Sequence, residues 1–164
     1  LSPDVVTLGK PMANGHPVAA VVAKSEVMAA FRNAFGYFNT FGGNPVSCAA
    51  AAATLDVIEQ DNLIENAKEV GAEFLHSLYS INHTSIANIR GRGLFIALEL
   101  ETDGVADEAL AAHVVEYARN NGMLMGRTGR KRNVLKLRPP MPFSASNAIV
   151  ASDIMARAFK ATKV

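Results

Sequence analysis

The sequence predicts an α/β fold, and three features of the chain support this prediction. Two short apolar runs, residues 5–8 and 18–23, flank a loop rich in glycine and proline and are typical of buried strands in an α/β sheet. Beyond residue 80, strand-like and helix-like patterns alternate, which favours a small α+β domain whose antiparallel sheet is covered by helices. A chain of 164 residues is long enough for a real hydrophobic core.

The first half of the chain contains three predicted helices. Ser25 can cap a helix over residues 26–33. Asn44 is a good N-cap for an alanine-rich helix over residues 45–60, which begins with a proline. A third helix follows, with Asp61 as its expected cap. Its apolar residues recur at the helical period and are Leu63, Ala67, Val70, Phe74 and Leu78.

The second half of the chain alternates between strands and helices. The predicted elements are a pair of strands over 86–99, a helix over 107–121, short strands over 123–125 and 134–138, and a closing helix over 145–160 behind Ser144. The glycines in the first pair of strands indicate a bulge or a close backbone approach. We therefore expect two domains, one formed by residues 1–80 and one by residues 81–164.

Composition argues against several classes of function. The formal net charge is +1, no block of like charges occurs and no apolar run approaches the ~20 residues that span a bilayer, so we expect neither nucleic acid nor a membrane as a partner. We expect a soluble, cytoplasmic protein. Cys48, the single cysteine, lies among alanines and is expected to pack in the core. The four histidines lack metal-ligand spacing, so no metal is expected.

Lys10 is the residue whose surroundings most favour chemistry. It lies in the Gly-, Pro- and Asn-rich loop between the two apolar runs, where we expect it to be partly desolvated. Desolvation favours the neutral amine, which can attack a carbonyl and hold it as a Schiff base. The alternative is a surface lysine in an ordinary turn.

A second candidate site lies just before the helix that Asn44 caps. There, Thr40 and the pair Gly42-Gly43 approach the helix N-terminus. Backbone N–H groups and a threonine hydroxyl at such a position can bind a phosphate. The alternative is a capped helix preceded by an ordinary turn.

Together these two segments resemble the class III, ornithine-type aminotransferases of fold type I, which depend on pyridoxal 5'-phosphate. The likeness rests on Leu-Gly-Lys-Pro-Met-Ala-Asn-Gly-His-Pro at residues 8–17 and Thr-Phe-Gly-Gly-Asn-Pro at residues 40–45, and it continues to the C-terminus. Both motifs are most similar to the branch that contains alanine–glyoxylate aminotransferases and amino-alcohol phosphate phospho-lyases. The resemblance implies that residues 1–80 end the large cofactor-binding domain and that residues 81–164 form the small C-terminal α+β domain.

The resemblance also implies roles for two residues. Lys10 would form the Schiff base with pyridoxal 5'-phosphate and carry a proton in catalysis. Thr40 would hydrogen-bond the cofactor phosphate of the neighbouring subunit, which implies a homodimer or a larger homo-oligomer. The implied reaction transfers an amino group from a small-molecule donor, an amino acid or amine, to a 2-oxo acid. A phospho-lyase that acts on an amino-alcohol phosphate is the alternative, because the lysine loop alone does not separate the two reactions.

A third cluster lies on the predicted strand over residues 134–138. Period-two alternation places Lys136 and Arg138 on one face of this strand, where two cations can receive a substrate carboxylate or phosphate. In many relatives an arginine at the position of Lys136 binds the substrate α-carboxylate, so the lysine departs from the family and tilts the expectation towards a phosphate. The alternative is a pair of solvated charges on an edge strand. The basic residues at 127–132 are expected to form a solvated loop.

The length of the chain suggests a part of an enzyme. Members of the family are more than twice as long as its 164 residues, and the aspartate that pairs with the pyridine nitrogen in the family would precede Lys10. We therefore expect the C-terminal part of an aminotransferase, with little or no activity by itself. An inactive folded fragment that pairs with copies of itself is the alternative from another class.

Overall fold

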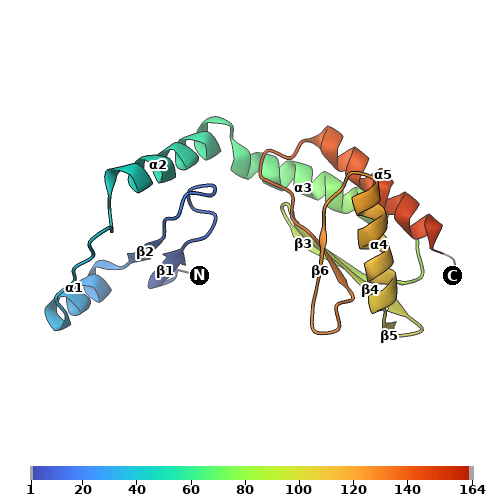
Figure 1. Cartoon of the computed structure of the whole chain (residues 1–164), viewed down its shortest axis with the longest axis horizontal. Coiled ribbons are helices and arrows are strands. Elements are labelled where there is room, and N and C mark those ends of the chain that lie inside the picture. The colour runs from blue at the N-terminus through green and yellow to red at the C-terminus, as the bar shows by residue number, and fades with distance from the viewer. Residues whose placement is uncertain (1, 163–164) are drawn as a thin grey trace. The chain divides into compact units, whose positions relative to one another are not determined.

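The computed structural model describes residues 2–162, and Figure 1 shows the path of the chain. Helices and strands occur together in both halves, which confirms the predicted α/β class. The chain divides into two compact units between Asp61 and Asn62.

The first unit contains an antiparallel pair of strands and two helices, drawn in blue to blue-green in Figure 1. β1 (Val5–Leu8) pairs with β2 (Ala20–Ala23) along its whole length. α1 (Ser25–Ala34) follows β2, and α2 (Pro45–Gln60) ends the unit. The bounds of α2 agree with the prediction.

The two strands of this unit are exposed, which contradicts the prediction that they are buried. Val5, Val21 and Val22 keep 47%, 64% and 59% of their surface accessible. Strands of an α/β sheet become buried when other elements cover both of their faces. Within residues 2–61 the apolar side of α1 lines one hollow with the strand pair, and the remaining strand surface has no cover.

Of the three helix caps predicted for the first half of the chain, the structure contains one. Asn44 caps α2 as predicted. α1 is preceded by Lys24, which makes no side-chain cap, so Ser25 is the first helical residue rather than the cap. The next helix follows Asn62, a residue with φ of 50°, and not the predicted cap Asp61.

The second unit is an antiparallel sheet packed against three helices. Its strands, in spatial order, are β3 (Ile86–Arg92), β4 (Phe95–Thr102), β7 (Val134–Leu137) and β6 (Gly126–Thr128), and the short β5 (Val105–Ala106) pairs with β4. Its helices are α3 (Leu63–Tyr79), α4 (Glu108–Asn120) and α5 (Ala145–Ala161). This arrangement confirms the predicted antiparallel sheet covered by helices.

The hydrophobic core lies between one face of the sheet and the helices. Along β4, Ile96, Leu98 and Leu100 are buried, whereas Ala97 and Glu99 alternate with them on the other face and are partly exposed. In Figure 1, α5 runs beside α3, and both contribute to the core. The large buried side chains from the helices and β7 are Phe74, Leu78, Leu135, Leu137, Met155 and Phe159.

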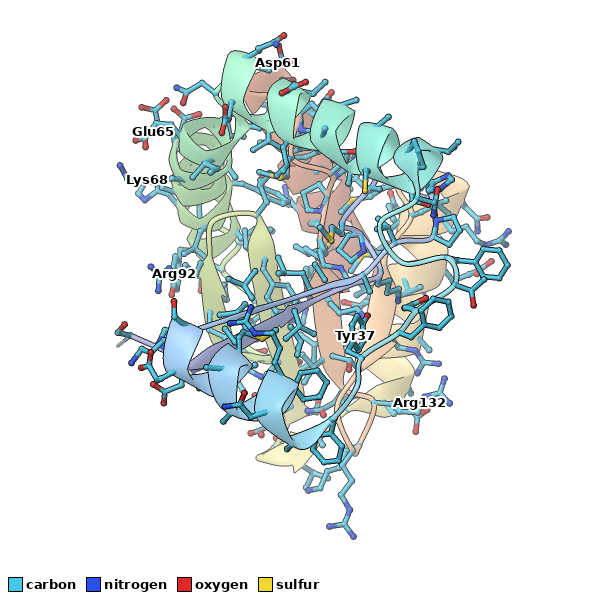
Figure 2. All side chains as sticks on the ribbon, turned by 90° about the vertical axis from the view of Figure 1, so that its left-hand side faces the viewer. Tyr37, Asp61, Glu65, Lys68, Arg92 and Arg132 are labelled. Atoms are coloured by element: carbon cyan, nitrogen blue, oxygen red, sulfur yellow. The ribbon has the colours of Figure 1, made fainter. Side chains whose placement is uncertain are left out.

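Two glycines allow α3 to approach the turn between β3 and β4. A Cβ atom on Gly71 would lie 2.3 Å from the carbonyl carbon of Gly93, which itself has φ of +54°. The close backbone approach predicted for these glycine-rich strands is therefore present at Gly93. The solvent side of α3 carries the ion pair between Glu65 and Lys68, whose side chains lie near each other in Figure 2.

Two strands differ from the prediction. β6 occupies Gly126–Thr128, which is shifted by three positions from the predicted strand over residues 123–125. β5 was not predicted, although Asp103 and Gly104, with φ of 53° and 73°, form the Asp-Gly turn that signals a tight hairpin.

The domain boundary predicted near residue 80 falls after α3, and α3 packs here against β3 and α5 of the second unit. The division into residues 1–80 and 81–164 refers to the domains of a larger enzyme and stays a prediction. Among residues 2–162, no helix has both the length and the apolar character that crossing a membrane requires.

Candidate functional site

Lys10 lies in the loop that connects β1 to β2. Three backbone hydrogen bonds of 3.0–3.1 Å close successive turns between residues 9 and 16, each from a residue to the one three places before it. Lys10 and Asn14 have φ of 40° and 47°, in the left-handed region that residues other than glycine rarely adopt. The turns therefore hold Lys10 in a specific and uncommon backbone conformation.

The side chain of Lys10 is exposed within the first unit, so the predicted partial desolvation is absent there. The reason is the exposure of the strands on either side, which provide no apolar walls around the amine. Within residues 2–162, no acidic side chain lies within 4.0 Å of the Lys10 amine. Ala13, in the same loop, is buried.

Asn39 organises the segment before α2, and the sequence analysis missed it. Its side-chain oxygen accepts hydrogen bonds from the N–H groups of Phe41, at 3.2 Å, and Gly42, at 2.9 Å. The Gly42 N–H, which lies in the segment that we expected to bind a phosphate, is therefore already bonded. An asparagine just before a glycine-rich turn is a recognisable signal for such a structure. Thr40 is exposed, and within residues 2–162 its side chain makes no hydrogen bond.

The two motif segments are joined by a hydrogen bond between His16 and Ser47. The Nε2 atom of His16 lies 2.9 Å from the Oγ atom of Ser47, across 31 positions of sequence. Ser47 also belongs to the cap of α2, because its N–H donates to Asn44 Oδ1 at 2.9 Å and its Oγ accepts from Asn44 Nδ2 at 3.1 Å. The sequence analysis did not find this contact, since no local pattern relates the two residues.

Lys136 lies on an internal strand, which contradicts the alternative of charges on an edge strand. β7 is paired with β4 on one side and β6 on the other, and Lys136 stands opposite Ala97 and Gly126. These small neighbours leave a hollow beside Lys136 on the open face of the sheet. Arg138 follows the end of β7 and is exposed.

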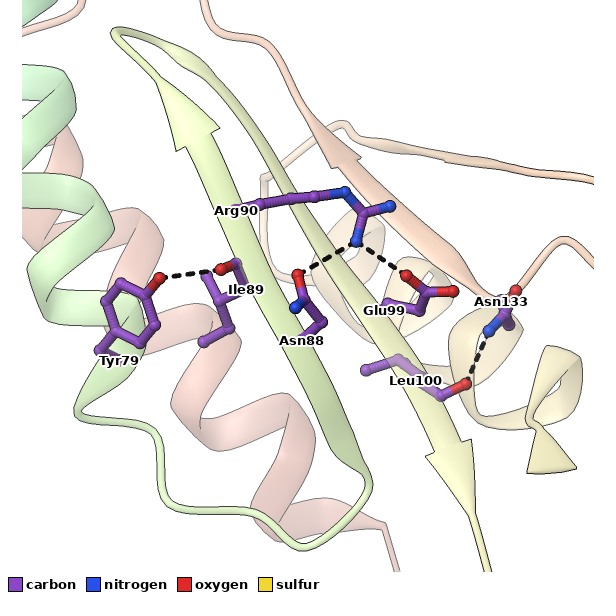
Figure 3. Close-up of polar contacts among 7 residues, drawn as sticks. All are labelled: Tyr79, Asn88, Ile89, Arg90, Glu99, Leu100 and Asn133. Carbon is purple, nitrogen blue, oxygen red and sulfur yellow. Dashed lines mark hydrogen bonds and ion pairs between the residues drawn. The ribbon is translucent and has the colours of Figure 1, made fainter. Parts of the chain in front are cut away.

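Arg90 and Arg92 line the same hollow as Lys136. The guanidinium of Arg90 donates to Glu99 Oε2 at 2.8 Å and to Asn88 Oδ1 at 3.2 Å, as Figure 3 shows. The charge of Arg90 is therefore compensated within the sheet. Lys136 and Arg92 have no ion pair within residues 2–162, so they are the cations of this face that can still receive an anion.

The basic loop is partly neutralised by one carboxylate. Arg127 and Arg132 each lie 3.3 Å from Glu108 Oε1, which fits the predicted solvated loop better than a phosphate site. Cys48 is exposed on α2, so the prediction that it packs in the core is wrong for this unit. Among residues 2–162, no group of three His, Cys, Asp or Glu side chains is placed to hold a metal ion.

Asp107 is the carboxylate with the clearest structural role. It caps α4 by accepting a hydrogen bond from the Leu110 N–H at 2.8 Å, and it also accepts one from the Thr102 hydroxyl at 2.8 Å. The Leu110 bond, followed by the Thr102 bond, lowers the pKa of Asp107 below its ordinary value. The group therefore stabilises the second unit in its charged form.

The chain is similar to several proteins of known family. It is 39% identical to ethanolamine-phosphate phospho-lyase homolog 1 of Caenorhabditis elegans, over 90% of this chain and 33% of that protein. It is 41% identical to the alanine–glyoxylate aminotransferase 2-like protein of Drosophila melanogaster, over 89% of this chain and 31% of that protein. The chain thus spans about a third of the length of these relatives.

A solved structure resembles the fold closely. A phospholyase from Arthrobacter, in complex with phosphoethanolamine, matches 99% of this chain and 40% of its own with a TM-score of 0.96 and 36% identity. The sequence profile of the class-III aminotransferases matches residues 1–159. With nearly the whole chain covered by that profile and by the fold of such enzymes, the chain belongs to the class-III aminotransferase family.

Proposed function

We propose that this chain forms part of a pyridoxal 5'-phosphate-dependent aminotransferase. The reaction moves an amino group from a small-molecule donor, an amino acid or amine, to a 2-oxo acid. The chain would supply the lysine that holds the cofactor and the cations that bind an anionic substrate. The chain covers 33% and 31% of these relatives, so the activity is proposed for a longer protein that contains this chain.

Lys10 is the observation that carries the proposal. The backbone of Lys10 is held by successive turns in an uncommon left-handed conformation, which sets the direction in which its side chain leaves the loop. The donor set fits pyridoxal phosphate, because Lys10 offers an amine to the aldehyde and Thr40 offers an exposed hydroxyl to the phosphate. When bound, the cofactor supplies an electron sink for the carbanion at the substrate Cα.

Lys10 would have two tasks in the reaction. Its amine would hold the cofactor aldehyde covalently until the amine of the substrate replaces it. The released amine would then take the proton from the substrate Cα and deliver it to C4′ of the cofactor.

The test is borohydride reduction of a full-length protein that contains this chain, followed by peptide mapping. We expect the pyridoxyl label on Lys10. A label on another lysine would show that the proposal assigns the wrong residue. The chain has other lysines, such as Lys24, which is held by Asp4 at 2.6 Å and serves as an internal comparison.

Thr40 extends the proposal to the assembly. We propose that it binds the cofactor phosphate across a subunit interface, so that the enzyme is a homodimer or a larger homo-oligomer. The exposure of Thr40 and the ordered turn around it support this role. Sedimentation of the full-length protein tests the assembly, and an active monomer would contradict it. The cytoplasmic location expected from the sequence stays a prediction.

A phospho-lyase is the second candidate, and Lys136 favours it. Lysine can bind a phosphate as a point charge, but it cannot form the planar pair of bonds with a carboxylate that arginine forms. A relative named as a phospho-lyase homolog and the phospholyase structure with phosphoethanolamine support this alternative. Release of inorganic phosphate from phosphoethanolamine, without transfer of the amino group to an added 2-oxo acid, would identify the lyase.

The 164-residue chain taken alone is proposed to be inactive. Its exposed apolar strands and helix α1 give it surface that could pair with copies of the chain. An absorbance spectrum with added pyridoxal phosphate tests whether the chain binds the cofactor. Gel filtration tests whether it self-associates.

A further inference from the structure

We propose that His16 and Ser47 form a positioning link that holds the loop bearing Lys10 in the conformation needed to capture the cofactor. The proposal rests on the function proposed for Lys10. Neither residue would touch the cofactor. Each would act through the backbone of the loop, so both are positioning residues.

The loop needs a link of this kind because its own conformation is unfavourable. Lys10, Asn14 and Gly15 all have positive φ, at 40°, 47° and 107°. Residues other than glycine in this region are strained and stay there when the surrounding structure constrains them. The backbone hydrogen bonds between residues 9 and 16 are local, so they shape each turn without attaching the loop to a neighbouring element.

His16 supplies that attachment. It is the last residue of the series of turns, and its ring lies 2.9 Å from the Ser47 hydroxyl. Within residues 2–162, residues 9–17 make no other side-chain hydrogen bond to a neighbouring element. Both partners are partly buried, so the bond competes less with water than an exposed one would.

Ser47 is a rigid partner for His16. It lies in the first turn of α2, and Asn44 fixes it twice, through the Ser47 N–H and through the Ser47 hydroxyl. The link therefore runs from the cap of a sixteen-residue helix to the end of the lysine loop. A loop attached at this point has fewer conformations in which Lys10 is turned away from the cofactor.

The experiment uses a full-length protein that contains this chain, prepared without cofactor. Ser47→Ala removes the hydroxyl and with it the bonds to His16 and to Asn44 Nδ2, but it keeps the Ser47 N–H that donates to Asn44 Oδ1, so the main bond of the α2 cap persists. His16→Leu removes the other partner, and His16→Gln can restore a hydrogen bond. Thr54→Val is the matched control, because the Thr54 hydroxyl bonds only to the Ala50 carbonyl within the same helix.

Two quantities are measured for each variant. The first is the amide hydrogen exchange of residues 9–16. The second is the rate at which Lys10 captures added pyridoxal phosphate, trapped with borohydride and quantified by peptide mass. Loss of one hydrogen bond predicts about three- to ten-fold faster exchange and about three- to ten-fold slower capture for Ser47→Ala and His16→Leu.

The expected pattern also includes recovery and coupling. His16→Gln should recover most of the capture rate, and Thr54→Val should match the wild type. The double variant of His16→Leu with Ser47→Ala should be no slower than Ser47→Ala alone, because Ser47→Ala already removes the hydrogen bond to His16. Additive losses would indicate two separate effects and overturn the link.

Further outcomes separate the inference from the proposed function. If the wild-type protein is labelled on Lys10 and the variants capture the cofactor at the wild-type rate, the positioning role alone is overturned, even if amide hydrogen exchange in the variants becomes faster. Unchanged exchange in the variants overturns the link itself. A wild-type protein that labels a lysine other than Lys10 overturns both the inference and the proposed function.

Discussion

Replacing Lys136 with methionine removes one positive charge and keeps a side chain of similar length. Lys136 lies between Ala97 and Gly126, and no acidic side chain within residues 2–162 lies within 4.0 Å of its ammonium. Its charge is therefore available to a bound anion. Because a hydrogen bond to a charged group contributes about 1.5–3 kcal/mol, we expect kcat/KM for the true substrate to fall about ten- to hundred-fold in the full-length enzyme.

Two substrates and two further variants sharpen this experiment. Phosphoethanolamine, followed by phosphate release, tests the lyase, and an amino acid with a 2-oxo acid tests the aminotransferase. Lys136→Arg keeps the positive charge and should retain most of the efficiency with either substrate, because a guanidinium pairs with a phosphate or a carboxylate through two parallel bonds. Lys131→Met, in the exposed basic loop, is the control and should leave both activities unchanged.

Two outcomes would contradict a contact between Lys136 and the substrate anion. If Lys136→Met has wild-type kinetics with both substrates, the hollow on the open face of the sheet does not bind the substrate anion. A loss that Lys131→Met reproduces would show a general effect of charge on the protein rather than a contact. Arg138→Met should have a smaller effect than Lys136→Met, since Arg138 is exposed beyond the end of β7.

The remaining predictions concern three other positions. Thr40→Val should weaken cofactor binding about ten- to hundred-fold in the full-length protein, and unchanged affinity by fluorescence titration would contradict the role of its hydroxyl. Gly71→Ala should destabilise the second unit by about 1–3 kcal/mol, because its Cβ would meet the backbone of Gly93 at 2.3 Å; urea unfolding measures this, and stabilisation by the better helix former would refute it. The lowered pKa of Asp107 gives stability that is present above the ordinary aspartate pKa and is lost as the pH falls through the lowered value. Asp107→Asn, which can still cap α4, should therefore flatten the dependence of Tm on pH below about pH 4, and an unchanged acid limb would contradict this.

Local signals made much of the fold predictable. Asn44 followed by a proline set the start of α2, and Ser144 set the start of α5, where its hydroxyl accepts the Asn147 N–H. Each cap joins residues no more than three positions apart, so the start of the helix can be predicted from the local sequence. The same reasoning could have found β5 from the Asp103-Gly104 turn. It could not place the three-residue β6, which is too short for a period and exists because it pairs with β7.

Part of the candidate site could be predicted from local sequence, and part could not. Lys10, Thr40 and Lys136 could be predicted from the sequence, because the family motifs and the alternation along a strand are patterns of adjacent residues. The contact between His16 and Ser47 depends on how the chain folds back over 31 positions, and no local rule relates them.

Neighbours along the chain are enough to identify the family and the caps of α2 and α5. The three-dimensional fold was needed to show that β7 is internal, that Glu99 compensates the charge of Arg90, and that β1 and β2 are exposed within their unit. Strand order, burial and the pairing of charges arise from contacts between distant segments. Their free energies depend on which segments meet, and local propensity does not specify this.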